Sequence, residues 1–155
     1  KLERVITMKI ETQCLHAGYT PGNGEPLTLP IYQSTTYKYE STAQVAKLFD
    51  LTADGHMYSR ISNPTVAAVE AKIAALEGGV GALCTTSGQA ASLISVLNIL
   101  SCGDHILCTS TIYGGTINLF AVTLKRFGIE VSFVDADASE EELKTASSKH
   151  KSCLC

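Results

Sequence analysis

The chain has 155 residues, of which 45% are hydrophobic and 17% are charged, and this balance is typical of a folded domain. Twelve basic and fifteen acidic side chains give a formal net charge of −3, which excludes the strongly basic surface that nucleic-acid-binding proteins use. The longest uncharged stretch, residues 78–103, contains many hydroxyl and amide side chains, so it favours a core helix over a membrane span. We therefore expect a globular domain with no membrane or nucleic-acid partner.

Six cysteines are too few and too scattered to form a dense disulfide framework. None stands in a C-x-x-C pair, and the four histidines show no paired spacing, so the sequence contains no zinc-site pattern. Residues 1–20 carry charges throughout and lack the apolar core of a signal peptide. We expect a reducing, cytoplasmic setting, in which Cys84, Cys102 and Cys108 are inert core thiols.

Residues 1–60 are expected to form an extended arm rather than a domain of their own. Glycine and proline recur between residues 21 and 30, and only residues 42–51 indicate a short helix. An arm that buries so little apolar surface by itself is expected to pack on the following domain or on a neighbouring subunit.

The first strong helix signal begins at Asn63-Pro64, where asparagine can cap the helix and proline occupies its first turn. The apolar side chains of this helix recur at helical spacing: Val66, Val69, Ile73 and Leu76. Gly78-Gly79 ends it, and residues 81–85 predict a short buried strand. Residues 89–100 predict a second helix, which is apolar on nearly every face and is therefore expected to be buried on both sides.

The same alternation continues along the chain. Residues 105–109 and 130–134 predict two further buried strands, separated by a helix with basic side chains in its last turn. Ser139 and Glu142 have the spacing of a capping box and predict one more helix. Strands that alternate with helices indicate a parallel sheet covered on both faces, so the predicted fold class is α/β.

Three segments combine residue types that can bind a phosphate or a flat ring. Ser87-Gly88-Gln89 opens a helix, where free backbone N–H groups and the helix dipole favour an anion. Tyr58 and Arg60 precede another helix, and a guanidinium with a phenol can hold a phosphate. Tyr113 follows the strand at 105–109, at the edge where open α/β sheets bind ligands. Each segment also has a structural interpretation, as a helix cap, a surface arginine or a loop tyrosine.

Other catalytic motifs are incomplete or missing. The glycines of residues 79–83 lack the third glycine of a dinucleotide fingerprint and precede the predicted strand instead of following it. This disfavours a nicotinamide-binding domain, which would share the alternation of strands and helices. The sequence contains no G-x-S-x-G nucleophile motif, no Walker loop and no paired-carboxylate site.

The segments together resemble the amino-terminal part of the Cys/Met-metabolism family of pyridoxal-phosphate (PLP) enzymes, the cystathionine γ-synthase-like group of fold type I. The resemblance runs from Glu11 to Asp135 through HAGY, PIYQSTTY, YSRISNPT, LEGG, TTSGQAA, TIYGGTINLF and FGIEVSFVD. SGQAA and YGGTINLF look most like the O-acetylhomoserine sulfhydrylases, whereas related γ-lyases commonly carry cysteine at the position of Gly115. The resemblance implies an arm (1–60) before the first part of a PLP-binding α/β domain (61–145), with residues 146–155 outside the family.

The resemblance also implies roles for matching positions. Ser87-Gly88-Gln89 would hold the cofactor phosphate, with backbone N–H groups as donors. Tyr58 and Arg60 would reach the phosphate of the neighbouring subunit's cofactor, which implies a homo-oligomer, a dimer of dimers, with its active site at a subunit interface. Tyr113 would stack on the pyridine ring and take part in proton transfer at a small amino-acid substrate.

In the family a lysine links the cofactor and an aspartate holds its pyridine nitrogen, and both lie downstream of the residues that match here. None of the nine lysines stands in the family's cofactor-linking motif. We therefore expect a fragment of a PLP-dependent O-acetylhomoserine sulfhydrylase that is inactive alone. The alternatives are a non-catalytic truncated paralogue that binds at most a phosphate or another subunit, and a fragment of a cystathionine γ-synthase or methionine γ-lyase.

Overall fold

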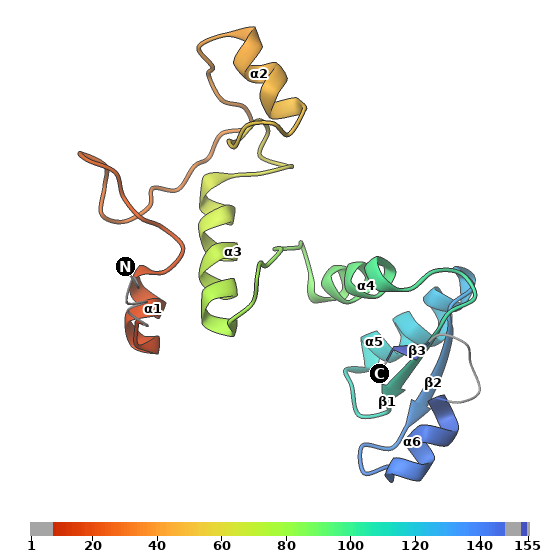
Figure 1. Cartoon of the computed structure of the whole chain (residues 1–155). Coiled ribbons are helices and arrows are strands. Elements are labelled where there is room, and N and C mark those ends of the chain that lie inside the picture. Colours follow the sequence, from red (N-terminus) through yellow and green to blue (C-terminus); the bar gives the residue numbers. More distant parts are fainter. Residues whose placement is uncertain (1–7, 148–152, 155) are drawn as a thin grey trace, which may run out of the picture. The chain divides into compact units, whose positions relative to one another are not determined.

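The computed structural model describes residues 8–147 and 153–154 (Figure 1). The chain divides into two compact units, Lys1–Cys84 and Thr85–Cys155, and each is described by itself. Within the described residues, no helix combines the length and the apolar character needed to cross a membrane.

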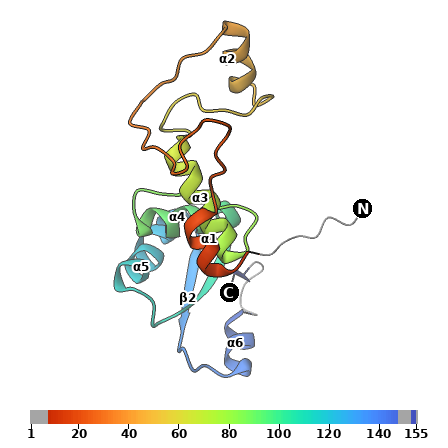
Figure 2. The ribbon, with the colours of Figure 1, turned by 90° about the vertical axis from the view of Figure 1, so that its left-hand side faces the viewer.

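The first unit contains three helices, α1 (Ile10–His16), α2 (Thr42–Phe49) and α3 (Pro64–Glu77). Helix α1 lies beside α3, as both ribbon views show (Figures 1 and 2). The Lys72 ammonium of α3 donates a hydrogen bond to the Cys14 carbonyl oxygen at 3.1 Å. Gly18 follows α1 with a φ of +88°, and a Cβ there would collide with the Ala68 carbonyl oxygen. Glycine is therefore required where the chain leaves α1 against α3.

The ends of α2 and α3 follow from their capping residues. The Ser41 hydroxyl accepts a hydrogen bond from the Gln44 backbone N–H at 3.2 Å, so α2 begins where the sequence predicts a short helix. The Asn63 side chain accepts from the Thr65 backbone N–H at 2.9 Å, and Gly78 ends α3 in the left-handed conformation. Helix α1 was not predicted, because it has neither a side-chain cap nor an apolar repeat.

The second unit alternates helices and parallel strands. In chain order it contains α4 (Gly88–Ile99), β1 (His105–Thr109), α5 (Gly114–Asn118), the π-helix η1 (Leu119–Leu124), β2 (Glu130–Val134), α6 (Glu140–Ser147) and β3 (Cys153–Leu154). The strand order is β2-β1-β3, and β1 pairs in parallel with both neighbours. In the register of the first pair, His105 lies opposite Glu130. The α/β class is thus confirmed, and β1 and β2 have their predicted bounds.

The core of the second unit is formed by α4, β1, η1 and the residue before β2. Its buried members are apolar side chains at or next to these elements: Val96, Leu100, Ile106, Phe120, Leu124 and Ile129. From β2 itself, Val131 and Phe133 pack against this core and are partly buried. Leu124 and Ile129 are 0% and 1% exposed, so the end of η1 and the start of β2 are the best-packed part of the unit. Because Glu130 pairs with His105, this packing lies at the amino end of β1, and the chain enters α5 after the opposite end.

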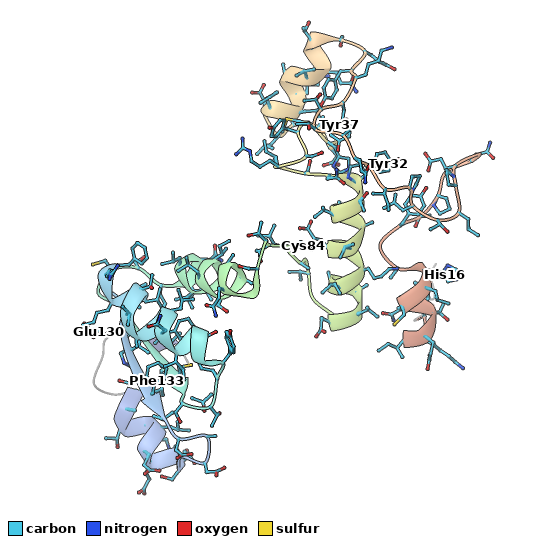
Figure 3. All side chains as sticks on the ribbon, turned by 180° about the vertical axis from the view of Figure 1, so that it is seen from behind. His16, Tyr32, Tyr37, Cys84, Glu130 and Phe133 are labelled. Carbon is cyan, nitrogen blue, oxygen red and sulfur yellow. The ribbon has the colours of Figure 1, made fainter. Side chains whose placement is uncertain are left out.

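The predicted strand at residues 81–85 is wrong, because this segment forms neither a strand nor a helix. Leu83 is 70% exposed, and the Cys84 backbone N–H donates to the Glu70 carboxylate at 2.7 Å instead of to a strand. A strand needs a hydrogen-bonded neighbour, and the described sheet places only β2 and β3 beside β1. Cys84 is labelled in the extended segment after α3 (Figure 3).

Two predictions about the helices also need correction. Helix α4 buries Val96 but leaves Ile94, Leu97 and Ile99 between 41% and 60% exposed, so it is not buried on both sides. The helix predicted between the strands forms, but it widens from α5 into the π-helix η1. Its residues show no sequence signal that distinguishes the wider turn from an ordinary α-helix.

Candidate functional site

The amino-terminal end of α4 leaves two backbone donors open. The Ser87 hydroxyl accepts from the Ala90 N–H at 3.1 Å, and the Ser87 carbonyl accepts from the Ala91 N–H at 3.0 Å. Among the described residues, nothing accepts a hydrogen bond from the backbone N–H of Gly88 or Gln89. A Cβ built on Gly88 would meet nothing within 4 Å, so a ligand can approach this backbone closely. These features fit a bound phosphate group.

Tyr113 lies at the carboxyl side of β1 and forms the N-cap of α5. Its ring is 75% exposed, while its carbonyl accepts from the Thr116 N–H at 2.8 Å and so fixes the backbone. A Cβ on Gly115 would lie only 2.5 Å from the Tyr113 ring and 2.9 Å from the Gln89 side-chain nitrogen. That nitrogen donates to the Thr116 hydroxyl at 3.3 Å. The structure therefore brings the predicted residues Gln89 and Tyr113 together around Gly115.

Tyr58 and Arg60 lie in the first unit, in a turn between α2 and α3. The Tyr58 carbonyl accepts from the backbone N–H groups of Ile61 and Ser62 at 2.8 and 2.9 Å. The Arg60 guanidinium carbon lies 5.4 Å from the centroid of the Tyr58 ring, a cation–π contact. Tyr58 is half-buried and Arg60 is exposed. The two side chains therefore form one group within the first unit.

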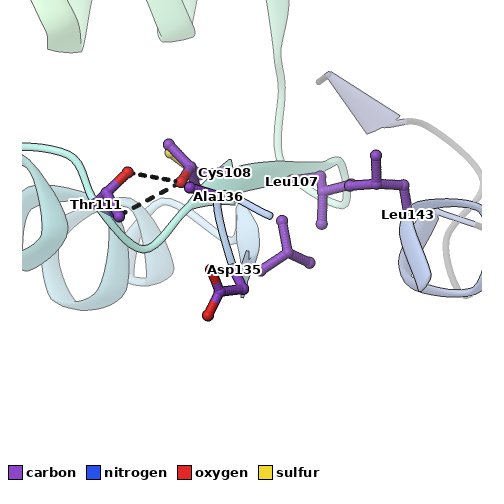
Figure 4. Close-up of a pocket in the computed structure, with 8 residues that line it drawn as sticks. Leu107, Cys108, Thr111, Asp135, Ala136 and Leu143 are labelled. Atoms are coloured by element: carbon purple, nitrogen blue, oxygen red, sulfur yellow. Dashed lines mark hydrogen bonds between the residues drawn. The ribbon is translucent and has the colours of Figure 1, made fainter. Parts of the chain in front are cut away.

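A pocket of about 340 Å³, which sequence reasoning missed, opens where β1 and β2 end (Figure 4). Leu107 and Leu143 point toward one another across it, and the Thr109 and Thr111 hydroxyls are 3.0 Å apart. Burial raises the pKa of the Cys108 thiol in its wall. Its position after two parallel strands is the one sequence signal that could have indicated it.

The histidine and cysteine predictions differ in outcome. His105 is 1% exposed, and its Nε2 lies 2.9 Å from the Ser132 hydroxyl on the neighbouring strand, which is a structural role. Cys84 and Cys102 are exposed, so the prediction that they are core thiols is wrong, whereas Cys108 is half-buried. Within residues 8–147 and 153–154, no three His, Cys, Asp or Glu side chains gather into a metal site.

Comparison with known proteins decides the family. The family model of the Cys/Met metabolism PLP-dependent enzymes matches residues 11–154. The chain belongs to this family. The match covers most of the sequence and extends over residues 146–154, which the motif comparison had placed outside the family. The family is PLP-dependent, in agreement with the predicted cofactor.

Two curated relatives show which members of the family the chain is similar to. The chain is 49% identical over 139 residues to O-acetyl-L-homoserine sulfhydrylase 1 of Thermus thermophilus, covering 87% of this chain and 32% of that protein. It is 46% identical over 143 residues to the homocysteine/cysteine synthase of Kluyveromyces lactis, covering 91% of this chain and 32% of the relative. The chain therefore spans about a third of the length of the curated relatives that it matches.

A solved structure shows the same architecture. It is a putative O-acetylhomoserine (thiol)-lyase from Campylobacter jejuni, with a TM-score of 0.81 and 38% sequence identity. The similarity covers 89% of this chain and 34% of that one, and that protein carries N'-pyridoxyl-lysine-5'-monophosphate. The likeness confirms the partial fold-type-I architecture that the motifs imply.

Proposed function

We propose that this chain forms part of a PLP-dependent O-acetylhomoserine sulfhydrylase, which converts O-acetylhomoserine and sulfide into homocysteine and acetate. The names of its most similar relatives support this choice within the family. The observation that carries it in the structure is the open amino-terminal end of α4, where Gly88 and Gln89 present free backbone N–H groups. Tyr113 lies close to the same helix end through its contact with Gly115.

In this proposal, the two N–H groups bind the phosphate of PLP. Two donors and the positive end of a twelve-residue helix suit an anion. The Ser87 hydroxyl caps the first turn, which keeps these donors aimed outward. Bound PLP supplies an electron sink for cleavage and formation of bonds in the amino-acid substrate. In the same proposal Tyr113, which is exposed, stacks on the cofactor, and its phenol moves a proton at the substrate.

Tyr58 and Arg60 complete the phosphate site in a second copy of the chain. Among the described residues, neither the Tyr58 hydroxyl nor the Arg60 guanidinium has a hydrogen-bonding or ionic partner, so both are available to a phosphate. A guanidinium and a phenol together offer charge-assisted donors of matching geometry. The proposal therefore includes a homo-oligomer in which each active site uses two subunits.

Titration of the chain with pyridoxamine 5'-phosphate tests the phosphate site without reaction at a lysine. We expect saturable binding, and much weaker binding of pyridoxamine, which lacks the phosphate. Gly88→Val fills the open space before the helix and should weaken binding about tenfold or more, the effect of losing one hydrogen bond to a charged group. Gly81→Val is the matched control, because Gly81 also has open space around it but lies outside α4. Equal binding of pyridoxamine 5'-phosphate by the unaltered chain, Gly88→Val and Gly81→Val would contradict the proposal.

Catalysis is tested on the native protein and on the 155-residue chain in parallel. The native protein should release homocysteine from O-acetylhomoserine in the presence of PLP and sulfide, and its intact mass should exceed 16.5 kDa. The 155-residue chain should release none, because its lysines lack the family's cofactor-linking motif. Homocysteine formation by the 155-residue chain alone would refute its expected inactivity. A native protein that is inactive with O-acetylhomoserine would refute the proposed activity.

A further inference from the structure

A polar cluster lies directly behind the turn that carries Tyr58 and Arg60. Thr36 forms an antiparallel bridge with Tyr58, and the Ser59 backbone N–H donates to the Thr35 carbonyl at 2.9 Å. The turn is therefore paired with the segment that contains Tyr32 and Tyr37, two residues that Figure 3 labels near the amino-terminal end of α3. This pairing joins two parts of the chain more than twenty residues apart in sequence.

Asn63 is the most buried member of the cluster, at 7% exposed. Its side-chain oxygen accepts from the Thr65 N–H at 2.9 Å, and its nitrogen donates to the Tyr32 carbonyl at 3.0 Å. A backbone N–H can only donate and a carbonyl can only accept, so these two partners fix the orientation of the amide. The same nitrogen also donates to the Ser59 hydroxyl at 3.0 Å. One side chain thus caps α3 and holds the turn.

The Ser59 hydroxyl has its full set of partners. Its single proton goes to the Ser34 carbonyl, which can only accept. The Tyr37 hydroxyl, 3.0 Å away, must therefore be the donor in its hydrogen bond with Ser59, as the Asn63 nitrogen is in the other. Ser59 lies between Tyr58 and Arg60 in sequence, so its three hydrogen bonds restrain the backbone that carries both side chains.

We infer that Asn63, Ser59 and Tyr37 are positioning residues, which hold the turn so that Tyr58 and Arg60 face outward as a preformed phosphate-binding pair. The inference rests on the proposed function, because it takes the phosphate contact of that pair as given. The side-chain donors of Asn63, Ser59 and Tyr37 all have acceptors within the protein. Among the residues that the structure describes, the Arg60 guanidinium contacts only the Tyr58 ring, 5.4 Å from the centroid, and so remains open to an anion.

The experiment compares variants of the full chain by nuclear magnetic resonance, with two readouts. The first readout is the nuclear Overhauser contact between the Tyr58 ring and the Arg60 side chain, measured without ligand. The second is the shift of the Arg60 Nε–H signal on titration with inorganic phosphate. Ser59→Ala and Tyr37→Phe should lose the contact and weaken the phosphate response at least about fivefold each, the effect expected when one neutral hydrogen bond is lost. Ser59→Ala should have the larger effect, because it removes all three hydrogen bonds of the Ser59 hydroxyl. Ser59→Thr keeps the hydroxyl and should restore both readouts.

Two further variants separate positioning from general stability. Asn63→Ser keeps an oxygen that can cap α3 but is too short to reach Ser59, so α3 should persist while the Tyr58–Arg60 contact is lost. Tyr19→Phe is the control, because it removes the hydroxyl that donates to the Pro26 carbonyl at 3.1 Å, elsewhere in the same unit. It should leave both readouts unchanged.

The outcomes distinguish this inference from the proposed function. If Ser59→Ala and Tyr37→Phe keep the Tyr58–Arg60 contact, or if Tyr19→Phe loses it equally, the positioning role is overturned. If the unaltered chain shows no phosphate response at Arg60, the proposed phosphate role of this pair fails. The contact readout then still decides whether the cluster positions the turn.

Discussion

Gly115 leaves open the space into which the Tyr113 ring and the Gln89 side chain extend. A Cβ there would lie 2.5 Å from the ring and 2.9 Å from the Gln89 nitrogen. Both neighbours are ends of side chains that can move, and the Tyr113 ring is 75% exposed. We therefore expect Gly115→Ala to displace both groups without lowering stability, because alanine gains up to about 1 kcal/mol over glycine inside a helix.

The matched control for Gly115→Ala is Gly114→Ala, which makes the same change one residue earlier, where nothing lies within 4 Å. Nuclear Overhauser contacts between the Tyr113 ring and residue 115, and the shift of the Gln89 side-chain amide, measure the displacement. Thermal unfolding measures stability. Unchanged contacts in Gly115→Ala would show that the positions of the Tyr113 ring and the Gln89 amide do not depend on having glycine at residue 115.

The candidate residues were predicted with different degrees of detail. The open helix end at Gly88 follows from the serine-glycine sequence alone, because the first N–H groups of any helix lack intrahelical partners. The approach of Gln89 and Tyr113 to Gly115 could not be predicted in this way. It depends on where side chains of α4 and of the start of α5 lie, and Gln89 and Gly115 are 26 residues apart in the sequence.

At the level of elements, local signals predicted every described helix except α1, whereas long-range pairing decided the strands. The asparagine cap predicted at Asn63 marks the start of α3, and in the structure Ser41 caps α2 in the same way. Each of these hydrogen bonds joins residues at most three apart. The strand predicted at residues 81–85 has the apolar composition of a strand but no pairing partner among the described residues. Composition can favour a strand, but only a hydrogen-bonded neighbour makes one.

The capping box of α6 predicts a pH dependence. Hydrogen bonds from the Ser139 backbone N–H, at 2.8 Å, and from its hydroxyl lower the pKa of the Glu142 carboxyl. A carboxyl whose pKa is lower in the folded helix stabilises it when ionised. This stabilisation is therefore complete above the ordinary pKa of 4.5 and is lost as the pH falls through the lowered value.

Titration of the Ser139 amide signal from pH 7 to pH 2 checks this prediction. The midpoint should fall below 4.5, and the helicity of α6 should decrease over the same range. Glu142→Gln should abolish the transition. Glu141→Gln should keep it, because the Glu141 side chain takes no part in the cap. A midpoint at or above 4.5 would contradict the assigned cap.

At the scale of the whole molecule, the alternation of strands and helices predicted the α/β class correctly but overestimated burial. The pattern of α3 implies an inward apolar stripe, yet Val66, Val69 and Ile73 are between 41% and 48% exposed. Periodicity identifies the apolar face of a helix, but it does not say which other part of a protein covers that face. The exposed side chains of α4 show the same difference between pattern and burial.

The exposed apolar side chains of α3 and α4 predict that the isolated chain binds hydrophobic dyes and self-associates. Ile94 and Leu97 lie three residues apart on α4, on neighbouring positions of one face, and are 48% and 41% exposed. Leu97→Lys should reduce dye fluorescence and the mean mass in sedimentation without loss of helicity, because a long polar side chain replaces exposed apolar surface. Asn98→Lys adds the same charge at the next exposed residue and should leave both unchanged. An equal decrease in both variants would assign the effect to net charge and not to the apolar face of α4.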